Sequence, residues 1–174
     1  MTDQTDTDSI VYVSSTLDDT GKAAVLMQWG PNQAVLTPVV TLTTARDLMA
    51  AACAAESDIA LIRTCREVLH LDDNTLAHLL RDVRIRRPKP NGKTALRIEA
   101  VAGAKTSQPY VHIGRGSMKR QMDPDTAREM ASHWIQAAVA SHIDVRLRYV
   151  LGEWDKLNVV EIVELFMLIR QTGR

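Results

Sequence analysis

The histidines, cysteines and carboxylates of this chain do not fall into the spacings of a known reaction site. The five histidines and two cysteines form no Cys-x-x-Cys, no His-Glu-x-x-His and no pair of histidines three or four residues apart. Those spacings are what place metal ligands on one turn or one helix face. His78 and Asp82 are one helical turn apart, which is more typical of a solvated pair than of an acid–base couple. We therefore expect no catalytic residue, no metal, no cofactor and no enzymatic activity.

Asn91-Gly92-Lys93-Thr94 has the letters that end a phosphate-binding loop. Such a loop needs an early glycine after a strand and a helix after the threonine, so that backbone N–H groups surround the phosphate. Arg87 stands where the early glycine would be, and the residues after Thr94 predict a strand. The sequence therefore predicts an ordinary turn into a strand here.

The charges are segregated although the net charge is zero. Residues 81–120 contain eleven basic and two acidic residues, so this segment carries +9 and the rest of the chain −9. Such asymmetry indicates a polyanionic partner, and lysine and arginine contacts to phosphates give salt-sensitive affinity. The candidate nucleic-acid-binding residues are Arg84, Arg86, Arg87, Lys89, Lys93, Arg97, Arg115, Lys119 and Arg120. Alternatively, these cations pair with carboxylates of the chain itself, among them those of the acidic N-terminal residues 1–9.

Two similar segments predict an internal repeat. The segment 44–48 (Thr-Ala-Arg-Asp-Leu) aligns with 126–130 (Thr-Ala-Arg-Glu-Met) at an offset of 82, and an apolar stripe of helical period follows each. Asp123 predicts the N-cap of the second helix and Thr41 that of the first. Asn74 and Asn158, at an offset of 84, predict the caps of a further helix in each copy.

Strand-like sequence precedes each helical part. Glycine-containing turn signals separate the expected strands, which cover 10–13, 23–29, 34–40, 95–102, 110–113 and 118–122. We therefore predict an α+β fold of two pseudo-repeated units, each with two or three antiparallel strands followed by three helices. The expected domains are a flexible acidic arm (1–9), a first unit (10–87), a linker (88–93) and a second unit (94–174).

The last predicted helix, 159–169, is apolar nearly all round, with nine apolar residues among eleven. A helix of this composition is buried on most sides. It lies either at the centre of the fold or in a subunit interface, and we expect a homodimer. The candidate interface residues are Val159, Val160, Ile162, Val163, Phe166 and Met167.

Residues 62–87 resemble the first two helices of a phage-repressor helix-turn-helix, in which a third helix enters the major groove. Pro88 leaves no room for that recognition helix, so no base-reading role follows from the resemblance. Separately, a strand pair followed by Met122–Ala131 (Met-Asp-Pro-Asp-Thr-Ala-Arg-Glu-Met-Ala) resembles small accessory proteins of actinobacteria and their phages. The first copy, 25–52, is a looser match because Leu42-Thr43 replaces Pro124-Asp125. That group is mostly uncharacterised, so the resemblance implies a source and no activity.

Several broader features complete the expectation for function. The N-terminus has no secretory signal, no apolar run could cross a bilayer, and only two cysteines are present. We expect a cytoplasmic, non-enzymatic regulatory protein without a membrane partner, which contacts DNA through its basic central band. The alternative is a phage- or host-encoded accessory factor that modulates a partner protein through an apolar helix or hairpin surface.

Overall fold

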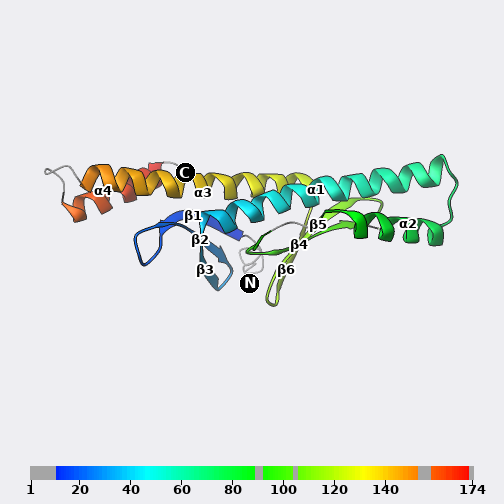
Figure 1. Ribbon diagram of the computed structural model, residues 1–174, viewed down its shortest axis with the longest axis horizontal. Helices are drawn as coiled ribbons and strands as arrows, with labels where there is room; N and C mark the ends of the chain where they lie inside the picture. Colours follow the sequence, from blue (N-terminus) through cyan, green and yellow to red (C-terminus); the bar gives the residue numbers. More distant parts are fainter. Residues whose placement is uncertain (1–10, 89–91, 104–105, 153–157, 173–174) are drawn as a thin grey trace, which may run out of the picture. The chain divides into compact units, whose positions relative to one another are not determined.

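The computed structural model describes residues 11–88, 92–103, 106–152 and 158–172. Two three-stranded antiparallel sheets and four helices make up this part of the chain, which confirms the α+β class (Figure 1). The elements follow the order β1 (Val11–Leu17), β2 (Ala23–Trp29), β3 (Asn32–Leu36), α1 (Pro38–Glu67), α2 (Asp73–Arg86), β4 (Arg97–Ala102), β5 (Pro109–Arg115), β6 (Met118–Met122), α3 (Pro124–Gly152) and α4 (Val159–Thr172). The predicted acidic arm, 1–9, lies outside the described residues.

Each sheet is a meander in which neighbouring strands pair in sequence order, β1-β2-β3 and β4-β5-β6. The hairpins β2–β3 and β5–β6 turn at Gly30 and Gly116, whose φ values are 54° and 58°. This left-handed conformation has no steric cost for glycine, which is why each turn carries one.

Helix α1 begins earlier than the sequence indicates. The Thr37 hydroxyl accepts a hydrogen bond from the Val40 N–H at 3.3 Å, so Thr37 and not Thr41 is the cap. Pro38 occupies the first helical position, where its missing N–H costs nothing and its fixed φ suits the helix. The strand expected over 34–40 ends at Leu36 because a proline cannot continue the pairing.

Among the described residues, each half contains two helices and not the predicted three. Helices α1 and α3 run without a break for 30 and 29 residues. Between its first residue and its last turn, each lacks glycine and proline and is rich in alanine, so nothing interrupts the backbone hydrogen bonds. The shorter helices then begin at Asp73 and Val159.

The caps of the two short helices agree only in part with the prediction. The Asn158 side chain accepts hydrogen bonds from Val160 N and Glu161 N at 3.0 Å, as expected for α4. The cap of α2 is Asp72, which accepts from Asn74 N and Thr75 N at 3.0 Å. Asn74 is therefore a residue of the first helical turn and not the predicted cap.

The elements recur at one constant offset, which is 86 residues. β1 begins at 11 and β4 at 97, α1 at 38 and α3 at 124, and α2 at 73 and α4 at 159. Buried residues recur at the same offset, including Ala45 with Ala131 and Ala52 with Ala138. The predicted offsets of 82 and 84 therefore do not relate equivalent positions, although a duplicated origin of the halves stays a prediction.

The described chain forms two compact units that mix the two halves of the sequence. Unit 1 (residues 1–41 and 135–174) holds β1–β3 with most of α3 and all of α4. Unit 2 (residues 42–134) holds β4–β6 with α1 beyond its first turn, α2 and the start of α3. Each sheet therefore shares a unit with helices from the other half, whereas the predicted domains, 10–87 and 94–174, follow sequence order. Residues 89–91 of the predicted linker lie outside the described residues.

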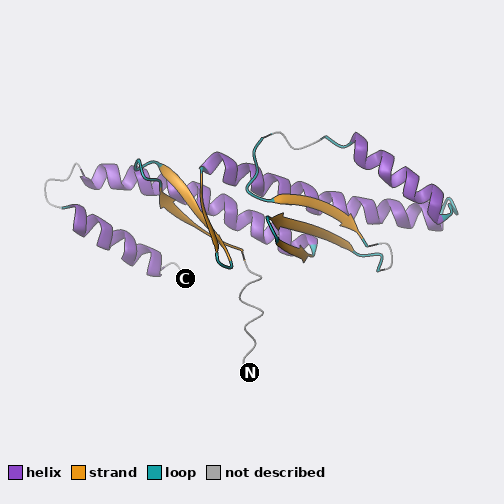
Figure 2. Cartoon of the chain, turned by 90° about the horizontal axis from the view of Figure 1, so that it is seen from below, coloured by secondary structure: helices purple, strands orange, loops and turns teal. Residues whose placement is uncertain are grey.

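The sheet of each unit has one face against helices and one open face, as the views in Figures 1 and 2 show. In unit 1, Val25 of β2 packs with Ala137 and Ala138 of α3. In unit 2, Ile62 and Cys65 of α1 pack with Leu76 of α2. Small alanines at the helical contacts let the backbones approach closely, which is consistent with the low aromatic content of the chain.

Candidate functional site

A buried carboxylate holds two of the predicted nucleic-acid-binding residues. The Asp58 side chain in α1 is fully buried, and its Oδ2 atom accepts a hydrogen bond from Arg84 Nε at 2.8 Å. Arg87 Nη2 donates to the other oxygen, Oδ1. Two guanidinium groups from the end of α2 thus neutralise one carboxylate and fasten α2 to α1. Arg84 and Arg87 therefore have a structural contact within unit 2.

The other predicted cations divide between partnered and open positions. Arg97 pairs with Glu99, with 2.8 Å between Nε and Oε1, and Arg115 Nη1 donates to the backbone oxygen of Ala95 at 3.0 Å. Arg86 and Lys93 are exposed. Lys89 lies outside the described residues.

The sheet of unit 2 brings two of the predicted cations, Arg97 and Lys119, to one place, which we call the sheet-face hollow. Strand pairing sets Gly114 of β5 directly between Arg97 of β4 and Lys119 of β6. Because Gly114 has no side chain, the surface dips there, and the hollow encloses about 360 Å³. Its lining also includes Arg120, Glu99 and His112, and a 2.8 Å contact joins His112 Nε2 to Gln121 Oε1.

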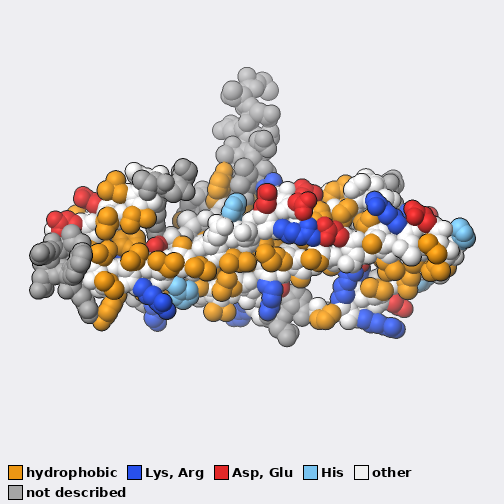
Figure 3. All heavy atoms as spheres, turned by 90° about the horizontal axis from the view of Figure 1, so that it is seen from above, with side chains coloured by type: hydrophobic (Ala, Val, Ile, Leu, Met, Phe, Trp, Pro, Cys, Tyr) orange, Lys and Arg blue, Asp and Glu red, His pale blue; other side chains and the backbone are white. Residues whose placement is uncertain are grey.

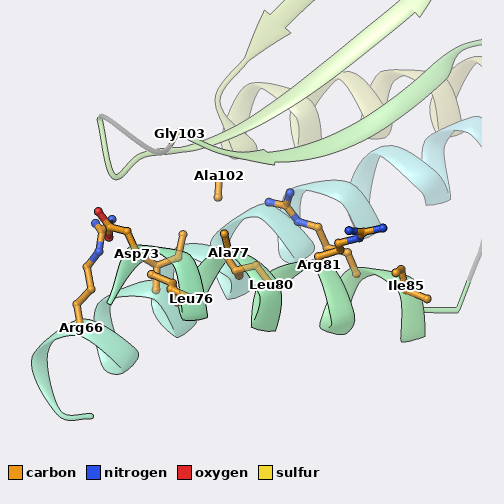
Figure 4. Close-up of a pocket in the computed structure, with 11 residues that line it drawn as sticks. Arg66, Asp73, Leu76, Ala77, Leu80, Arg81, Ile85, Ala102 and Gly103 are labelled. Carbon is orange, nitrogen blue, oxygen red and sulfur yellow. The ribbon is translucent and has the colours of Figure 1, made fainter. Parts of the chain in front are cut away.

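A larger concave surface lies elsewhere in unit 2, and most of its lining belongs to the segment 62–87 that resembles part of a helix-turn-helix. We call it the α2 groove: an open groove of about 830 Å³ between α2, the second half of α1 and the end of β4. In Figure 4, Leu76, Ala77 and Leu80 rise from α2 toward Ala102 and Gly103 on the opposite side. The middle of the α2 groove is therefore aliphatic.

Charged side chains stand at both ends of the α2 groove. At one end, Arg66 Nη2 and Asp73 Oδ1 form an ion pair at 2.8 Å. At the other end lie Arg81 and Arg84, of which Arg84 is bound to Asp58. Arg81 is exposed and has no ion-pair partner among the described residues. The lining thus holds three arginines and one aspartate.

Two positions of the α2 groove have larger counterparts in unit 1. At an offset of 86 residues, Ile62 and Leu80 of the α2 groove correspond to Arg148 and Phe166. The Arg148 guanidinium carbon lies 4.6 Å from the centre of the Phe166 ring, a cation–π contact. In unit 2 these two positions hold the smaller aliphatic side chains of Ile62 and Leu80, which line the α2 groove.

Helix α4 presents its predicted interface residues in two directions. Ile162 and Phe166 are buried within unit 1, and Val163 is half-buried. Val159, Val160 and Met167 are exposed by 77%, 66% and 61%. Burial on most sides at the centre of the fold, one of the two predicted alternatives, is therefore wrong, because several described side chains of α4 are exposed.

A second apolar surface in unit 1 was not predicted. Val139, Ile143, Leu147 and Val150 lie along one face of α3, and each is exposed by between 42% and 58%. Spacings of four, four and three residues place them in one row. We call this row the α3 ridge. Hydrophobic side chains are visible on the helical face that Figure 3 presents.

The described residues offer little for chemistry. They contain no cluster of three or more histidine, cysteine or acidic side chains that could hold a metal ion.

The helix-turn-helix resemblance covers the end of α1 and α2, and the next described element after α2 is strand β4. No helix in the described part of the chain is long and apolar enough to span a membrane.

Comparison with known proteins assigns this chain to no family and no fold. No protein-family model, no curated protein and no solved structure matches this chain. Function must therefore be argued from the surfaces described above.

Proposed function

We propose that this protein is a non-enzymatic accessory protein that acts by binding protein, through the apolar outer surfaces of α3 and α4 in unit 1. The observation that carries the proposal is the α3 ridge, four branched aliphatic side chains in a row with none of them buried. On α4, Val160 and Met167 add further exposed apolar area. Exposed aliphatic side chains that gather in one row are typical of interaction sites when the apolar area is large.

The occupant that we propose is a second copy of this chain. A two-fold axis would set the ridge of one copy against that of the other, so that rows with a spacing of four residues interlock. Charges of both signs flank the apolar surface, with Arg146 on α3 and Glu161 and Glu164 exposed on α4. Two identical surfaces with mixed charges can pair without net repulsion.

Light scattering coupled to size-exclusion chromatography tests the dimer. We expect wild type to elute as a dimer and Ile143→Glu or Leu147→Glu to elute as a monomer, because the new carboxylate would be buried without a partner. Gln28→Glu, at an exposed position of β2, is the matched control and should leave the dimer intact. A monomeric wild type at micromolar concentration would refute the second copy as occupant.

Nucleic-acid contact is the second candidate function, and the sheet-face hollow favours it. The supporting observation is that Arg97 and Lys119 flank Gly114 on the two neighbouring strands, where Glu99 neutralises part of the charge of Arg97. Phosphates are the anions that such clustered cations bind, with an affinity that falls as salt rises. Arg84 and Arg87 are left out of this site because Asp58 holds them.

Fluorescence anisotropy with labelled DNA and RNA tests this candidate. Lys119→Glu should abolish binding at low salt, whereas Lys22→Glu, an exposed lysine in the β1–β2 turn of unit 1, should not. Equal affinity of the two variants would exclude the hollow as the contact.

We further propose that the halves arose by duplication, which the constant offset of 86 residues supports. The predicted source among actinobacteria and their phages stays a prediction.

A further inference from the structure

We propose that the α2 groove binds a short aliphatic and acidic segment of a partner protein. This site lies in unit 2 and is independent of the self-association proposed for unit 1. The inference rests on the shape of the groove, the aliphatic character of its floor and the excess of positive charge at the end that holds Arg81.

The floor determines the apolar part of the ligand. Leu76 is buried, Leu80 is half-buried, and Ala77 is an exposed small residue between them. Across the groove, Ala102 adds another small apolar surface (Figure 4). Such a floor accepts aliphatic side chains and has few groups that could orient a polar metabolite.

The length of the groove favours a peptide. The lining extends along α2 from Asp73 to Ile85, which corresponds to about 18 Å of helix axis. An amphipathic segment of about 12 residues could lie along this length, in the manner in which helices occupy apolar grooves. The groove is open along its side, so that a segment of a folded protein can enter.

Charge complementarity determines the rest of the ligand. At the Asp73 end the charge of Arg66 is balanced, whereas at the Ile85 end Arg81 has no ion-pair partner among the described residues. Close by, the Asp58 carboxylate is shared by two arginines, so that this cluster keeps a net positive charge. A ligand carboxylate would therefore lie at the Arg81 end, and the aliphatic residues over Leu76 and Leu80.

The comparison of the two units supports a specialised groove. Arg148 and Phe166 occupy the equivalent positions in unit 1 and contact each other there. In unit 2 the corresponding Ile62 and Leu80 are aliphatic and line the α2 groove. The aliphatic lining at these two positions is therefore specific to unit 2.

Selection from a random 12-residue peptide library displayed on phage tests the proposal, with the full-length protein as bait. We expect the enriched peptides to combine aliphatic residues with aspartate or glutamate. Ala77→Phe should weaken their binding at least about tenfold, because a phenylalanine at this exposed position would fill the groove without entering the core. Arg81→Glu should weaken acidic peptides about tenfold and favour basic ones.

Two substitutions outside the groove serve as matched controls. Ala60→Phe places the same side chain on an exposed position of α1, and Arg86→Glu makes the same charge reversal on an exposed position of α2. Both should change the peptide dissociation constant less than twofold, and circular dichroism should confirm that all four variants are folded.

Several results would overturn the proposal. The first is that the selected peptides bind the wild-type protein and the Ala77→Phe variant with equal affinity. The second is that the enriched peptides lack acidic residues, and the third is that no peptide is enriched. If Ala77→Phe converts a dimer to a monomer, the occupant is a second copy of the chain. If a DNA oligonucleotide displaces the peptides, the groove belongs to a nucleic-acid site.

Discussion

Arg84 Nε lies 2.8 Å from Oδ2 of Asp58, and the Asp58 side chain has no exposed surface. Arg87 binds the other carboxylate oxygen. One acidic residue in the middle of α1 thus fixes the last turns of α2, and it removes two cations from the set that could contact phosphate. The positive charge of the central segment is partly a structural feature of unit 2.

Asp58→Asn is expected to destabilise the protein by about 2–4 kcal/mol. The substitution leaves two arginines without their carboxylate, and breaking a buried ion pair costs about 3–5 kcal/mol, reduced here because the arginines are partly exposed. Urea denaturation at pH 7 measures the free energy of unfolding. Asp82→Asn, on the exposed side of α2, is the control and should change it by less than about 0.5 kcal/mol.

Arginine substitutions in α2 should distinguish an arginine that stabilises the fold from one that is only exposed at the surface. We expect Arg84→Ala to lower the melting temperature by several degrees, since it removes a charge-assisted hydrogen bond to a buried carboxylate. Arg86→Ala, on an exposed residue two positions away, should leave it unchanged. Differential scanning calorimetry of the two variants compares them directly. Equal melting temperatures would show that the pair with Asp58 contributes no stability.

Asp47→Asn is expected to stabilise the protein at pH 7. Burial raises the pKa of Asp47. The positive charge of Arg46, whose Nε atom lies 3.8 Å from Asp47 Oδ1, only partly opposes this rise. A carboxyl group with a raised pKa in the folded state destabilises that state when it is ionised, so stability falls as pH rises through this pKa. The gain from Asp47→Asn should therefore shrink at acidic pH, where wild type is protonated. A loss of stability at pH 7 would instead indicate that the carboxylate makes a favourable contact.

Asp123→Ala is expected to reduce stability by about 1 kcal/mol at neutral pH, because Asp123 caps α3. Hydrogen bonds from the Thr126 hydroxyl and the Thr126 N–H hold the pKa of Asp123 below its ordinary value. The stabilisation is complete above the unfolded-state pKa of about 3.9 and is lost as pH falls through the lower folded-state value. Unfolding measured from pH 7 to pH 2 should show the wild-type and variant curves converge only in acid. Parallel curves over that range would contradict the role of the carboxylate.

The amino-acid sequence indicates much of the secondary structure, because turns, caps and strand patterns are local. Gly30 and Gly116 lie in the turns of the hairpins, as their residue type favours. Helix α3 begins after Asp123, with Pro124 as its first residue. The errors are also local in origin. Thr37-Pro38 competes with Thr41 as the start of α1, and the similar letters at 44–48 and 126–130 lie four residues out of the register of the elements.

The candidate sites depended on contacts that no local pattern contains. Asp58 is a charged residue on the buried side of a helix that also carries Ile62 and Cys65, and this pattern could have predicted a buried ion pair. Its partners, 26 and 29 residues away, could not be deduced from spacing. The α2 groove likewise brings α2 to the end of β4, which follows it in the chain after a turn-rich segment.

The sequence by itself determined the α+β class, the hairpins, the starts of α3 and α4 and the concentration of basic residues in the middle of the chain. These follow from backbone preferences and hydrophobic period, which act over a few residues. Only the tertiary structure decided which cations are neutralised, which face of α4 is covered and which helices share a unit with which sheet. Those outcomes depend on burial and packing between residues far apart in sequence, such as the contacts of Asp58 with Arg84 and Arg87.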